Sequence, residues 1–388
     1  MRNSSYEIEI AQDQQNWQVS AASFNQYYAS INPKSFAANK SEQIISINYQ
    51  ENMHNKYISG YWENWKNAYN PGEGSTSDAS YYKNDIEPMT HVYYSFLNLA
   101  KNPNPYSPPA SYWNGEALYE SISAENVLTV MTKTDPLWSN PAEWQRVKIA
   151  ALIEAVNQNN GKFIWAIGGW SDVTKTITPN QVDNFVNQCV ELLKLSGDGI
   201  DFDWEHLSQD ASIRDEQLQT LANVLLKLRQ ALDQAGLSDK EIGYTTRFNA
   251  FWNNTNQPEN HSAFASDGEG LEIENYLNQQ GSSLNDVVDW VNIMMYDVPP
   301  SNLGSPNGFT LENYKVVFNA FEKYIDKDKI VMGFEPGGQA AGGQWEGLEV
   351  DKDVIDYIQQ NGYGGVMFGQ LINQRIIQPK LRLKMLLN

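Results

Sequence analysis

Cysteine is almost absent from this chain of 388 residues, which contains Cys189 and no other. A single cysteine excludes a disulfide within the chain. Cys189 lies in the stretch "VDNFVNQCVELLKL", where apolar residues recur at three- and four-residue spacing. That spacing is typical of an amphipathic helix, so we interpret Cys189 as a packing residue rather than a catalytic nucleophile.

Basic residues are also scarce, because 27 Lys and Arg stand against 47 Asp and Glu and leave a formal net charge of −20 at pH 7. Nucleic acids and anionic membranes are bound by basic surfaces that displace counterions, so the charge argues against both as partners. Neutral or cationic partners fit this composition better.

Long apolar runs are missing as well. No stretch reaches the roughly 18 apolar residues that a membrane-spanning helix needs. The opening residues, "MRNSSYEIEIAQDQQNWQVS", lack the basic and then apolar pattern of a signal peptide. The sequence as given therefore shows no export route.

Aromatic residues, by contrast, are abundant. They make up 12% of the chain, with 12 Trp and 21 Tyr. This is more than core packing alone requires, and it indicates flat side-chain surfaces that stack on a ligand.

Short β-branched and aromatic runs alternate with longer amphipathic stretches from residue 57 onward. The runs cover residues 57–62, 91–99, 162–169, 199–205, 241–248, 290–297, 329–335 and 364–369. Eight strands separated by helices predict an α/β fold, a closed parallel (β/α)8 TIM barrel. An open doubly wound sheet is the alternative, although no run is followed by a GxGxxG or GxxxxGK[ST] phosphate loop. We assign the barrel to residues 56–388 and interpret residues 1–55, rich in Asn, Gln and Ser, as a partly ordered N-terminal extension.

Barrel enzymes build their sites at the carboxyl ends of the strands, so the polar residues that end these runs are candidates for a site at one mouth. They are Trp62, Glu63, Asn98, Gly168 to Trp170, Glu205, Tyr296, Asp297 and Glu335.

The fourth run carries an unusual density of acids, "DGIDFDWEH" at residues 198–206. Successive side chains of a strand point to opposite faces, so Asp201, Asp203 and Glu205 share one face while the apolar residues between them share the other. Alternate residues lie about 6.6 to 6.8 Å apart, and like charges that close cannot all ionise freely. Such a stack retains a proton and can keep its terminal carboxyl protonated as a general acid.

Two other interpretations of these acids are open. They could pair with buried Arg or Lys, although the strand itself carries no basic residue. They could instead bind Mg²⁺ or Ca²⁺, which prefer carboxylate oxygens. The stretch lacks a Dx[DN]x[DN]G calcium loop, and the spacing of a strand offers poor cage geometry, so we expect no metal.

The stretch "DGIDFDWE" resembles the DxxDxDxE signature of glycoside hydrolase family 18, the chitinases and endo-β-N-acetylglucosaminidases. All four acids are in place, at Asp198, Asp201, Asp203 and Glu205. The segments "SGYWENW", "YYSFLNL", "AIGGW" and "MMYD" match other landmarks of the family in the expected order. The resemblance covers roughly residues 57–388 and implies a TIM-barrel glycosidase without a cofactor.

For the mechanism, the resemblance implies that the 2-acetamido oxygen of the sugar attacks the anomeric carbon and forms an oxazolinium intermediate, with net retention. Glu205 would protonate the leaving oxygen and then act as base for water. Asp203 would orient the acetamido group and stabilise its positive charge, and Asp201 would share a proton with Asp203. Tyr296 would donate its hydroxyl to the acetamido oxygen.

The resemblance also implies residues that contact the sugar, whose apolar C–H faces pack on aromatic rings. These substrate-binding residues are Tyr61, Phe96, Gly169, Trp170, Met294 and Asp297. Further tryptophans that could stack on sugars are Trp62, Trp65, Trp113, Trp252 and Trp345.

The sequence departs from the family at two positions near the site. Ala166 stands where the third strand commonly carries Ser, and Gly369 or Gln370 stands near the position of a Trp that floors the reacting subsite. The connection between the seventh and eighth strands is also too short for the small domain that exo-acting members often insert there. A shallow, open cleft and internal cleavage are therefore expected.

We expect a hydrolase of β-1,4-linked N-acetylglucosamine polymers, chitin above all, which by the nature of that substrate acts outside the cell. The partner is then a polysaccharide or oligosaccharide that contains N-acetylglucosamine. An endo-β-N-acetylglucosaminidase acting on N-glycans is the close alternative. A non-catalytic glycan-binding protein is a third, although such barrels typically lose the acid that Glu205 provides here.

Overall fold

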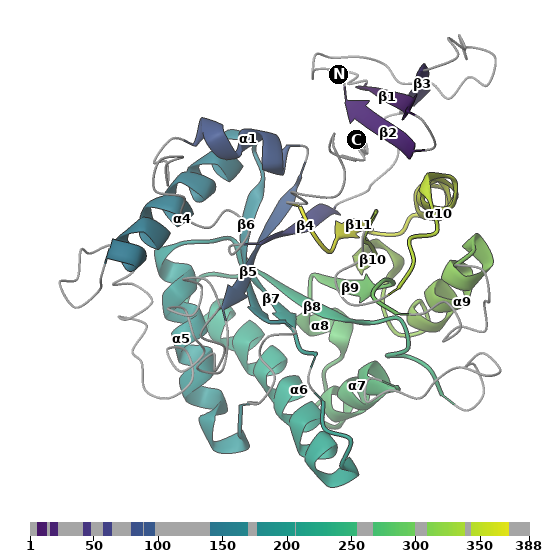
Figure 1. Cartoon of the computed structure of the whole chain (residues 1–388). Coiled ribbons are helices and arrows are strands. Elements are labelled where there is room, and N and C mark those ends of the chain that lie inside the picture. The colour runs from purple at the N-terminus through teal and green to yellow at the C-terminus, as the bar shows by residue number, and fades with distance from the viewer. Residues whose placement is uncertain are drawn as a thin grey trace.

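Eight parallel strands form a closed barrel in the computed structural model (Figure 1). In chain order the strands are β4 (Tyr57–Glu63), β5 (His91–Leu97), β6 (Lys162–Gly168), β7 (Gly199–Asp203), β8 (Glu241–Arg247), β9 (Trp290–Met294), β10 (Ile330–Phe334) and β11 (Gly365–Phe368). The last strand pairs with the first and closes the ring. The predicted TIM barrel is confirmed, and the open sheet is excluded.

The structure describes twelve segments of the chain. They are residues 6–13, 16–21, 42–47, 57–63, 79–87, 89–97, 140–169, 177–205, 207–253, 267–298, 309–337 and 343–371. Of the sequence-predicted candidates, Trp65, Asn98, Trp113 and Trp170 lie outside them.

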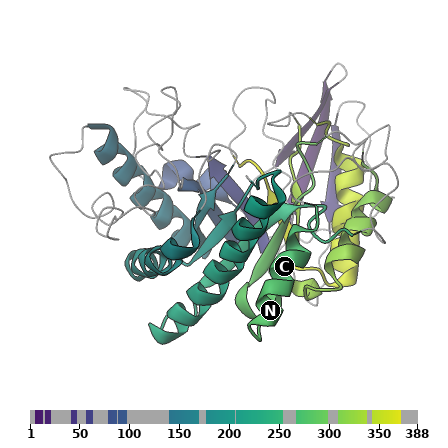
Figure 2. The same ribbon diagram turned by 90° about the horizontal axis from the view of Figure 1, so that it is seen from below.

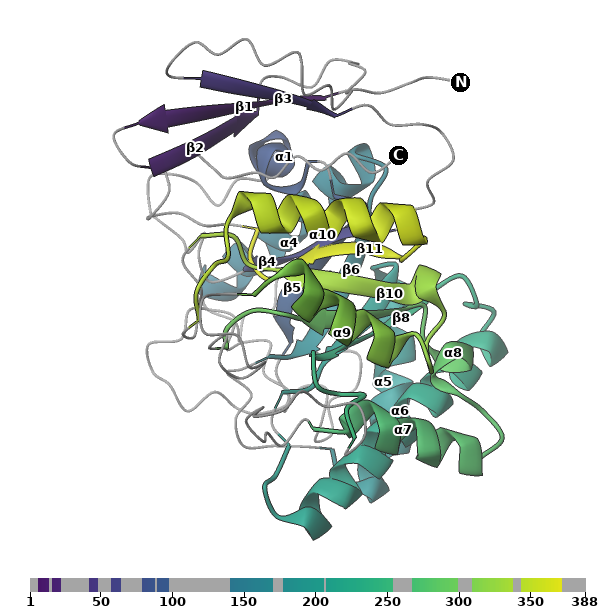
Figure 3. The same ribbon diagram turned by 90° about the vertical axis from the view of Figure 1, so that its right-hand side faces the viewer.

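Helices surround the barrel, as the views turned by 90° show (Figures 2 and 3). They are α1 (Ser80–Ile86), α4 (Asn140–Gln158), α5 (Val182–Leu195), α6 (Ala211–Gln234), α7 (Glu269–Gln279), α8 (Leu284–Val287), α9 (Leu311–Phe321) and α10 (Leu348–Asn361). Single 3-10 turns at Pro179–Gln181 and Lys327–Lys329 precede α5 and β10. Within the described segments, none of these helices has both the length and the apolar character needed to span a membrane.

The long helix α6 illustrates how the sequence sets the helical layer. Its start is capped by Asp210, whose side chain accepts the backbone N–H groups of Ser212 and Ile213. It ends just before Gly236, which adopts a left-handed φ of 71°. Cys189 is buried in the neighbouring helix α5, and burial raises the pKa of its thiol, as suits a packing residue.

The core has two parts, which the alternation along each strand separates. Side chains on the outer face pack beneath the helices, and Ile200, Phe202 and Trp204 belong to this outer core. Side chains on the inner face fill the barrel, and the aromatic members of this inner core are Tyr57, Tyr61, Tyr93, Trp290 and Tyr296. The acids of β7 point inward among these rings.

The strand bounds agree with the expected runs to within a few residues. The fourth strand is shorter than its run, which was expected to extend to residue 205. β7 ends at Asp203, so Trp204 and Glu205 lie just beyond it. Pairing with both neighbours stops at this point, at Gly168 on β6 and Thr245 on β8. Glu205 therefore lies at the mouth of the barrel, not within the sheet.

Two regions of the chain bear on the predicted division into an N-terminal extension and a barrel without an inserted domain. The strands β1 (Tyr6–Asp13), β2 (Asn16–Ala21) and β3 (Glu42–Ile47) form an antiparallel sheet in the order β2-β1-β3. The barrel begins with Tyr57, and the division of the chain near residue 56 stays a prediction. Between β10 and β11 the described residues form the single helix α10.

Candidate active site

Three carboxyl groups rise through the upper half of the barrel interior. Asp201 is 0% exposed and Asp203 is 3% exposed, while the side chain of Glu205 is 9% exposed at the mouth. On the neighbouring strand β8, Asp201 is level with Gly243 and Asp203 with Thr245. The predicted alternation thus places all three acids on the inner face.

Asp201, the deepest acid, accepts hydrogen bonds from several strands. Its oxygens lie 2.6 Å from the Tyr61 hydroxyl, 3.0 Å from the Thr245 hydroxyl, 3.2 Å from the Trp290 indole nitrogen and 3.4 Å from the Asn292 amide. Burial raises the pKa of Asp201 to about 6, and the bonds from Tyr61, Thr245 and Trp290 oppose that rise. Asp201 is therefore poised between its charged and neutral forms near neutral pH.

The space for this arrangement comes from a glycine on β8. A Cβ atom at Gly243 would overlap the indole ring of Trp290 and would lie 2.5 Å from a carboxylate oxygen of Asp201. Because Gly243 has no side chain, the indole of Trp290 fits beneath the carboxylate of Asp201 and donates its N–H group to it.

Asp203 occupies the middle of the stack. Burial raises the pKa of its carboxyl well above the ordinary range, the charges of Glu205 and Asp201 add to that rise, and Arg247 opposes it. Its Oδ1 atom is buried and has no hydrogen-bond partner among the described residues. A buried acceptor without a donor is costly, so this oxygen is poised to accept a donor from a ligand.

Glu205 forms an ion pair with Arg247, the last residue of β8. A guanidinium nitrogen of Arg247 lies 2.6 Å from Glu205 Oε2. Pairing with Arg or Lys was disfavoured from the sequence because the acidic strand has no basic residue, and for Glu205 that argument was wrong. The partner comes from the adjacent strand, which a search confined to one strand could not find.

Tyr296 lies two residues after β9, which is two strands around the barrel from the acids of β7. Its hydroxyl is 3.7 Å from the sulfur of Met367. Burial raises the pKa of the Tyr296 hydroxyl, and the charges of Asp203, Glu335 and Glu205 raise it further, so it stays a neutral donor. Asp297, the next residue, has a left-handed φ of 60°.

The paired glycines of β6 shape the wall beside Asp203. Gly168 has a φ of 111°, and the N–H group of Gly169 donates to the carbonyl oxygen of Asp203 at 2.8 Å. A Cβ atom at Gly169 would lie 2.6 Å from the ring of Phe96. The pair therefore holds the backbone of Asp203 and gives Phe96, which is half-buried, its place near the mouth.

The end of the last strand explains the departure noted in the sequence. A Cβ atom at Gly369 would lie 2.8 Å from the ring of Tyr296, so Tyr296 occupies the space that a side chain there would need. The next residue, Gln370, donates its amide N–H to the carboxylate of Glu335, which follows β10. This corner of the mouth is thus polar.

The sequence-predicted substrate residues fall into different settings, and their role as sugar contacts stays a prediction. Tyr61 and Met294 are buried in the inner core, and Tyr61 uses its hydroxyl on Asp201. Phe96 packs at the edge of that core.

The loosely assigned tryptophans differ from that group. Trp62 and Trp252 are buried in the outer core and leave no ring face for a sugar, so that part of the interpretation was wrong. Trp345 is partly buried, and its indole nitrogen lies 2.9 Å from Asp351.

Several residues that shape the site were missed by the sequence reasoning. They are Thr245, Arg247, Trp290 and Asn292. Arg247 is the last polar residue of the run "EIGYTTRF", so the rule that polar strand ends meet at the mouth would have found it. Trp290 carries no such signal, because its N–H group acts from deep inside the barrel.

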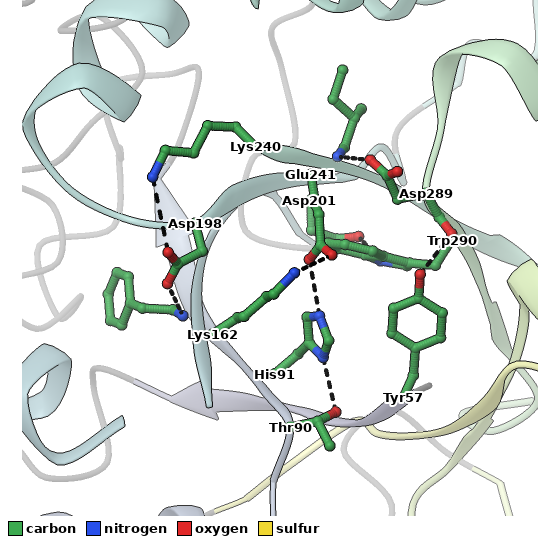
Figure 4. Close-up of polar contacts among 12 residues, drawn as sticks. Tyr57, Thr90, His91, Lys162, Asp198, Asp201, Lys240, Glu241, Asp289 and Trp290 are labelled. Carbon is green, nitrogen blue, oxygen red and sulfur yellow. Dashed lines mark hydrogen bonds and ion pairs between the residues drawn. The ribbon is translucent and has the colours of Figure 1, made fainter. Parts of the chain in front are cut away.

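A second polar cluster lies at the opposite end of the barrel, where the strands begin, and we call it the lower end (Figure 4). Glu241 at the start of β8 contacts Lys162 of β6, and its other oxygen lies 2.9 Å from Nε2 of His91. Burial alone would raise the pKa of Glu241, but the hydrogen bonds and charges of His91 and Lys162 lower it below the ordinary range. This carboxyl is held ionised.

The first acid of the "DGIDFDWE" motif belongs to the lower end. Asp198 accepts the backbone N–H group of Phe163 at 2.9 Å and lies 3.9 Å from the ammonium of Lys240. Nearby, Asp289 pairs with Arg229. The motif therefore runs through the barrel, from a structural acid at one end to the candidate catalytic acids at the other.

A metal site is not indicated by the geometry of the described segments. No three His, Cys, Asp or Glu side chains in them are placed to hold a metal ion.

Comparison with known proteins gives one family. A model of the family described as "Glycosyl hydrolases family 18" matches residues 57–346. "Chitinase A1" of Niallia circulans is 26% identical over 318 residues, which are 74% of this chain and 37% of that protein. "Endochitinase 1" of Metarhizium robertsii is 26% identical over 270 residues, which are 65% of this chain and 55% of that protein. The chain thus spans about a third to a half of the length of these two relatives.

A solved structure agrees on the fold. Catalytic domain 2 of a group II chitinase of Ostrinia furnacalis matches with a TM-score of 0.50 at 15% identity, over 81% of this chain and 89% of that one. At this level of identity the likeness shows the barrel alone.

Proposed function

The chain belongs to glycoside hydrolase family 18, and from that premise we propose that it hydrolyses β-1,4-linked N-acetylglucosamine polymers, chitin or chito-oligosaccharides. The observation that carries the proposal is the stack of Asp201, Asp203 and Glu205 on one inner face at the mouth. By the nature of such polymers, the enzyme would act outside the cell.

The first chemical step needs a proton on the leaving oxygen and a nucleophile at the anomeric carbon. Glu205 donates its proton to the glycosidic oxygen as that C–O bond breaks. The acetamido oxygen of the same sugar forms the new bond and gives a positively charged oxazolinium ion. In the second step water attacks the anomeric carbon, the bond from that carbon to the acetamido oxygen breaks, and Glu205 takes the proton of the water, which restores the acid with net retention.

Asp203 supports this chemistry because its buried oxygen lacks a donor among the described residues. The acetamido N–H of a bound sugar would supply that donor, and the negative charge of Asp203 would stabilise the oxazolinium. Asp201, with its pKa near 6, can take the proton that Asp203 gives up. Tyr296, a neutral donor, would hold the acetamido oxygen.

The cleavage mode follows from the connection between β10 and β11. The described part of that connection forms α10 and short loops, which supports an open cleft and attack within a chain. Phe96, Gly169, Trp170, Met294 and Asp297 remain the proposed sugar contacts, and Tyr61 acts through Asp201.

One observation favours a second candidate, an endo-β-N-acetylglucosaminidase acting on N-glycans. The corner of the mouth formed by Gly369, Gln370 and Glu335 is polar, whereas a floor for stacked chitin sugars would be aromatic. A branched glycan that binds through hydrogen bonds would suit such a corner.

Two substrates and one variant test the proposal. The wild-type protein and Glu205→Gln are incubated separately with chitohexaose and with a high-mannose glycoprotein, and the products are identified by mass. We expect short chito-oligosaccharides from wild type only. Glycan release from the glycoprotein alone would select the second candidate, and equal turnover by Glu205→Gln would overturn the mechanism.

A further inference from the structure

Arg247 reaches the catalytic acid because of its place on β8. The inner face of this strand carries Gly243 beside Asp201 and Thr245 beside Asp203, so the next inward position is Arg247, whose guanidinium meets Glu205 just beyond the last registered pair. The side chains of Arg247 and Glu205 are 17% and 9% exposed, and 2.6 Å separates their charged atoms. This is a short, largely desolvated ion pair.

That pair conflicts with the first step of the reaction. A general acid must carry a proton, whereas a guanidinium beside a carboxylate favours the ionised form. In the geometry observed, the guanidinium of Arg247 therefore favours the form of Glu205 that has no proton to give. The pair has to open before Glu205 can act as an acid.

The groups around Glu205 favour proton uptake once the pair opens. Among the described residues, Asp203 and Tyr296 interact electrostatically with Glu205, and the charges that act on these two include those of Asp201, Glu269, Asp297 and Glu335. These named groups are acids or phenols, and the cation that acts on Asp203 is Arg247 itself. When that cation moves away, the neighbouring negative charge of these described groups stabilises the protonated form of Glu205.

We propose that Arg247 is a positioning residue that holds Glu205 ionised in the free protein and leaves it when a sugar chain enters the mouth. Glu205 then takes up one proton from water and becomes the general acid, while the guanidinium turns to the bound sugar or to solvent. This inference rests on the proposed function, because it concerns the acid of that reaction. Glu205 is then an ion-paired carboxylate in the free enzyme and becomes a protonated acid only when substrate enters.

The pH profiles of kinetics distinguish this device from a static ion pair. The profile of kcat/KM reports the free enzyme, and that of kcat reports the enzyme–substrate complex. In Arg247→Met, which keeps an apolar stem, we expect the high-pH limb of kcat/KM to move up by about one pH unit. The high-pH limb of kcat should stay in place, since Arg247 has already left Glu205 in the complex.

Two further variants control this experiment. Arg247→Lys keeps a positive charge and should move the limb of kcat/KM less. Arg229→Met removes an arginine of similar exposure, 15%, which pairs with Asp289 at the lower end of the barrel, far from the mouth, and should move neither limb. If Arg247→Met moves neither limb, or moves both equally, the inference is overturned.

Proton uptake on binding tests the same idea without turnover. A thio-linked chitotetraose, which is not hydrolysed, is titrated into wild type, Arg247→Met and Glu205→Gln by calorimetry at pH 7 in buffers of different ionisation enthalpy. We expect wild type to take up about one proton more than Glu205→Gln, and Arg247→Met to take up less than wild type. Uptake in a protein that hydrolyses nothing would retain the inference and refute the function, whereas equal uptake by wild type and Glu205→Gln would refute the inference alone.

Discussion

The carboxyl groups at the two ends of the barrel have opposite electrostatic environments. At the lower end, Glu241 and Asp289 contact cations and keep their charge. At the mouth, Asp201 and Asp203 are fully enclosed and form no ion pair with the described residues, and burial pushes both toward the neutral form. Acids that are paired with cations stabilise a fold as charged groups, whereas acids that are buried and crowded together tend to retain a proton.

The largest effect is expected from a substitution among the acids at the mouth. Asp203→Asn keeps the shape of the side chain and removes the charge that stabilises the oxazolinium, so we expect kcat to fall about 100- to 1,000-fold. The fold should persist, because the change removes a buried group that repels its neighbours. Steady-state kinetics on chitohexaose, with circular dichroism as the check on folding, measure both. A loss below tenfold would contradict the assigned role.

The pH dependence of stability sharpens the contrast next. Since the pKa of Asp201 is raised from 3.8 to about 6, the folded state binds more protons than the unfolded state between these values. The contribution of Asp201 to stability therefore falls as the pH rises through that window. Asp201→Asn lacks this loss, so its free energy of unfolding relative to wild type should rise by about 3 kcal/mol from pH 3.5 to pH 7.

Urea unfolding at a series of pH values follows this change. The hydrogen bonds lost in Asp201→Asn lower its stability by a similar amount at each pH, so the slope is the readout and not the absolute value. A difference between variant and wild type that stays constant with pH would refute the assignment.

The lower end should respond with the opposite sign. Glu241→Gln removes the charge held by Lys162 and His91, and we expect it to cost about 1.5–3 kcal/mol of stability at pH 7 with kcat unchanged within twofold. Because the pKa of Glu241 is lowered in the folded state, this cost should be present above the unfolded pKa and vanish as the pH falls through the folded one. Lys315→Met, which breaks the exposed pair with Glu312, is the control and should change stability by less than about 1 kcal/mol.

The smallest effect concerns the indole beneath the stack. Trp290→Phe removes the N–H donor to Asp201, and a hydrogen bond of about 1 kcal/mol corresponds to roughly a fivefold loss in kcat. Trp165→Phe is the matched control, because that buried indole donates to the carbonyl oxygen of Ser196 on the outer face. Equal losses in the two variants would show a general packing effect and not a specific one.

The barrel and its acids were predictable because strands impose a strict period. The eight runs and the alternation of the fourth gave the fold and the inner face of Asp201, Asp203 and Glu205 without any knowledge of contacts. The same period gives Arg247 its inward direction. Its partner, however, depends on the register between two strands, which the sequence of neither strand encodes.

The hydrogen bond from Trp290 to the acid stack could not be predicted from the sequence, for another reason. Trp290 reaches Asp201 only because Gly243 has no side chain, and this requires knowing that two residues about fifty positions apart face each other. The buried positions of Trp62 and Trp252 were likewise invisible, because tryptophan packs a core and binds sugar with the same ring. The composition indicated that some aromatic rings bind a ligand, but it could not show which rings face the site and which face the core.

Gly369 also constrains how this protein can change. The Cβ atom of any other residue at that position would lie 2.8 Å from the ring of Tyr296, so the ring or the backbone has to shift to admit it. Substitutions at residue 369 should therefore be combined with changes that let the ring of Tyr296 move.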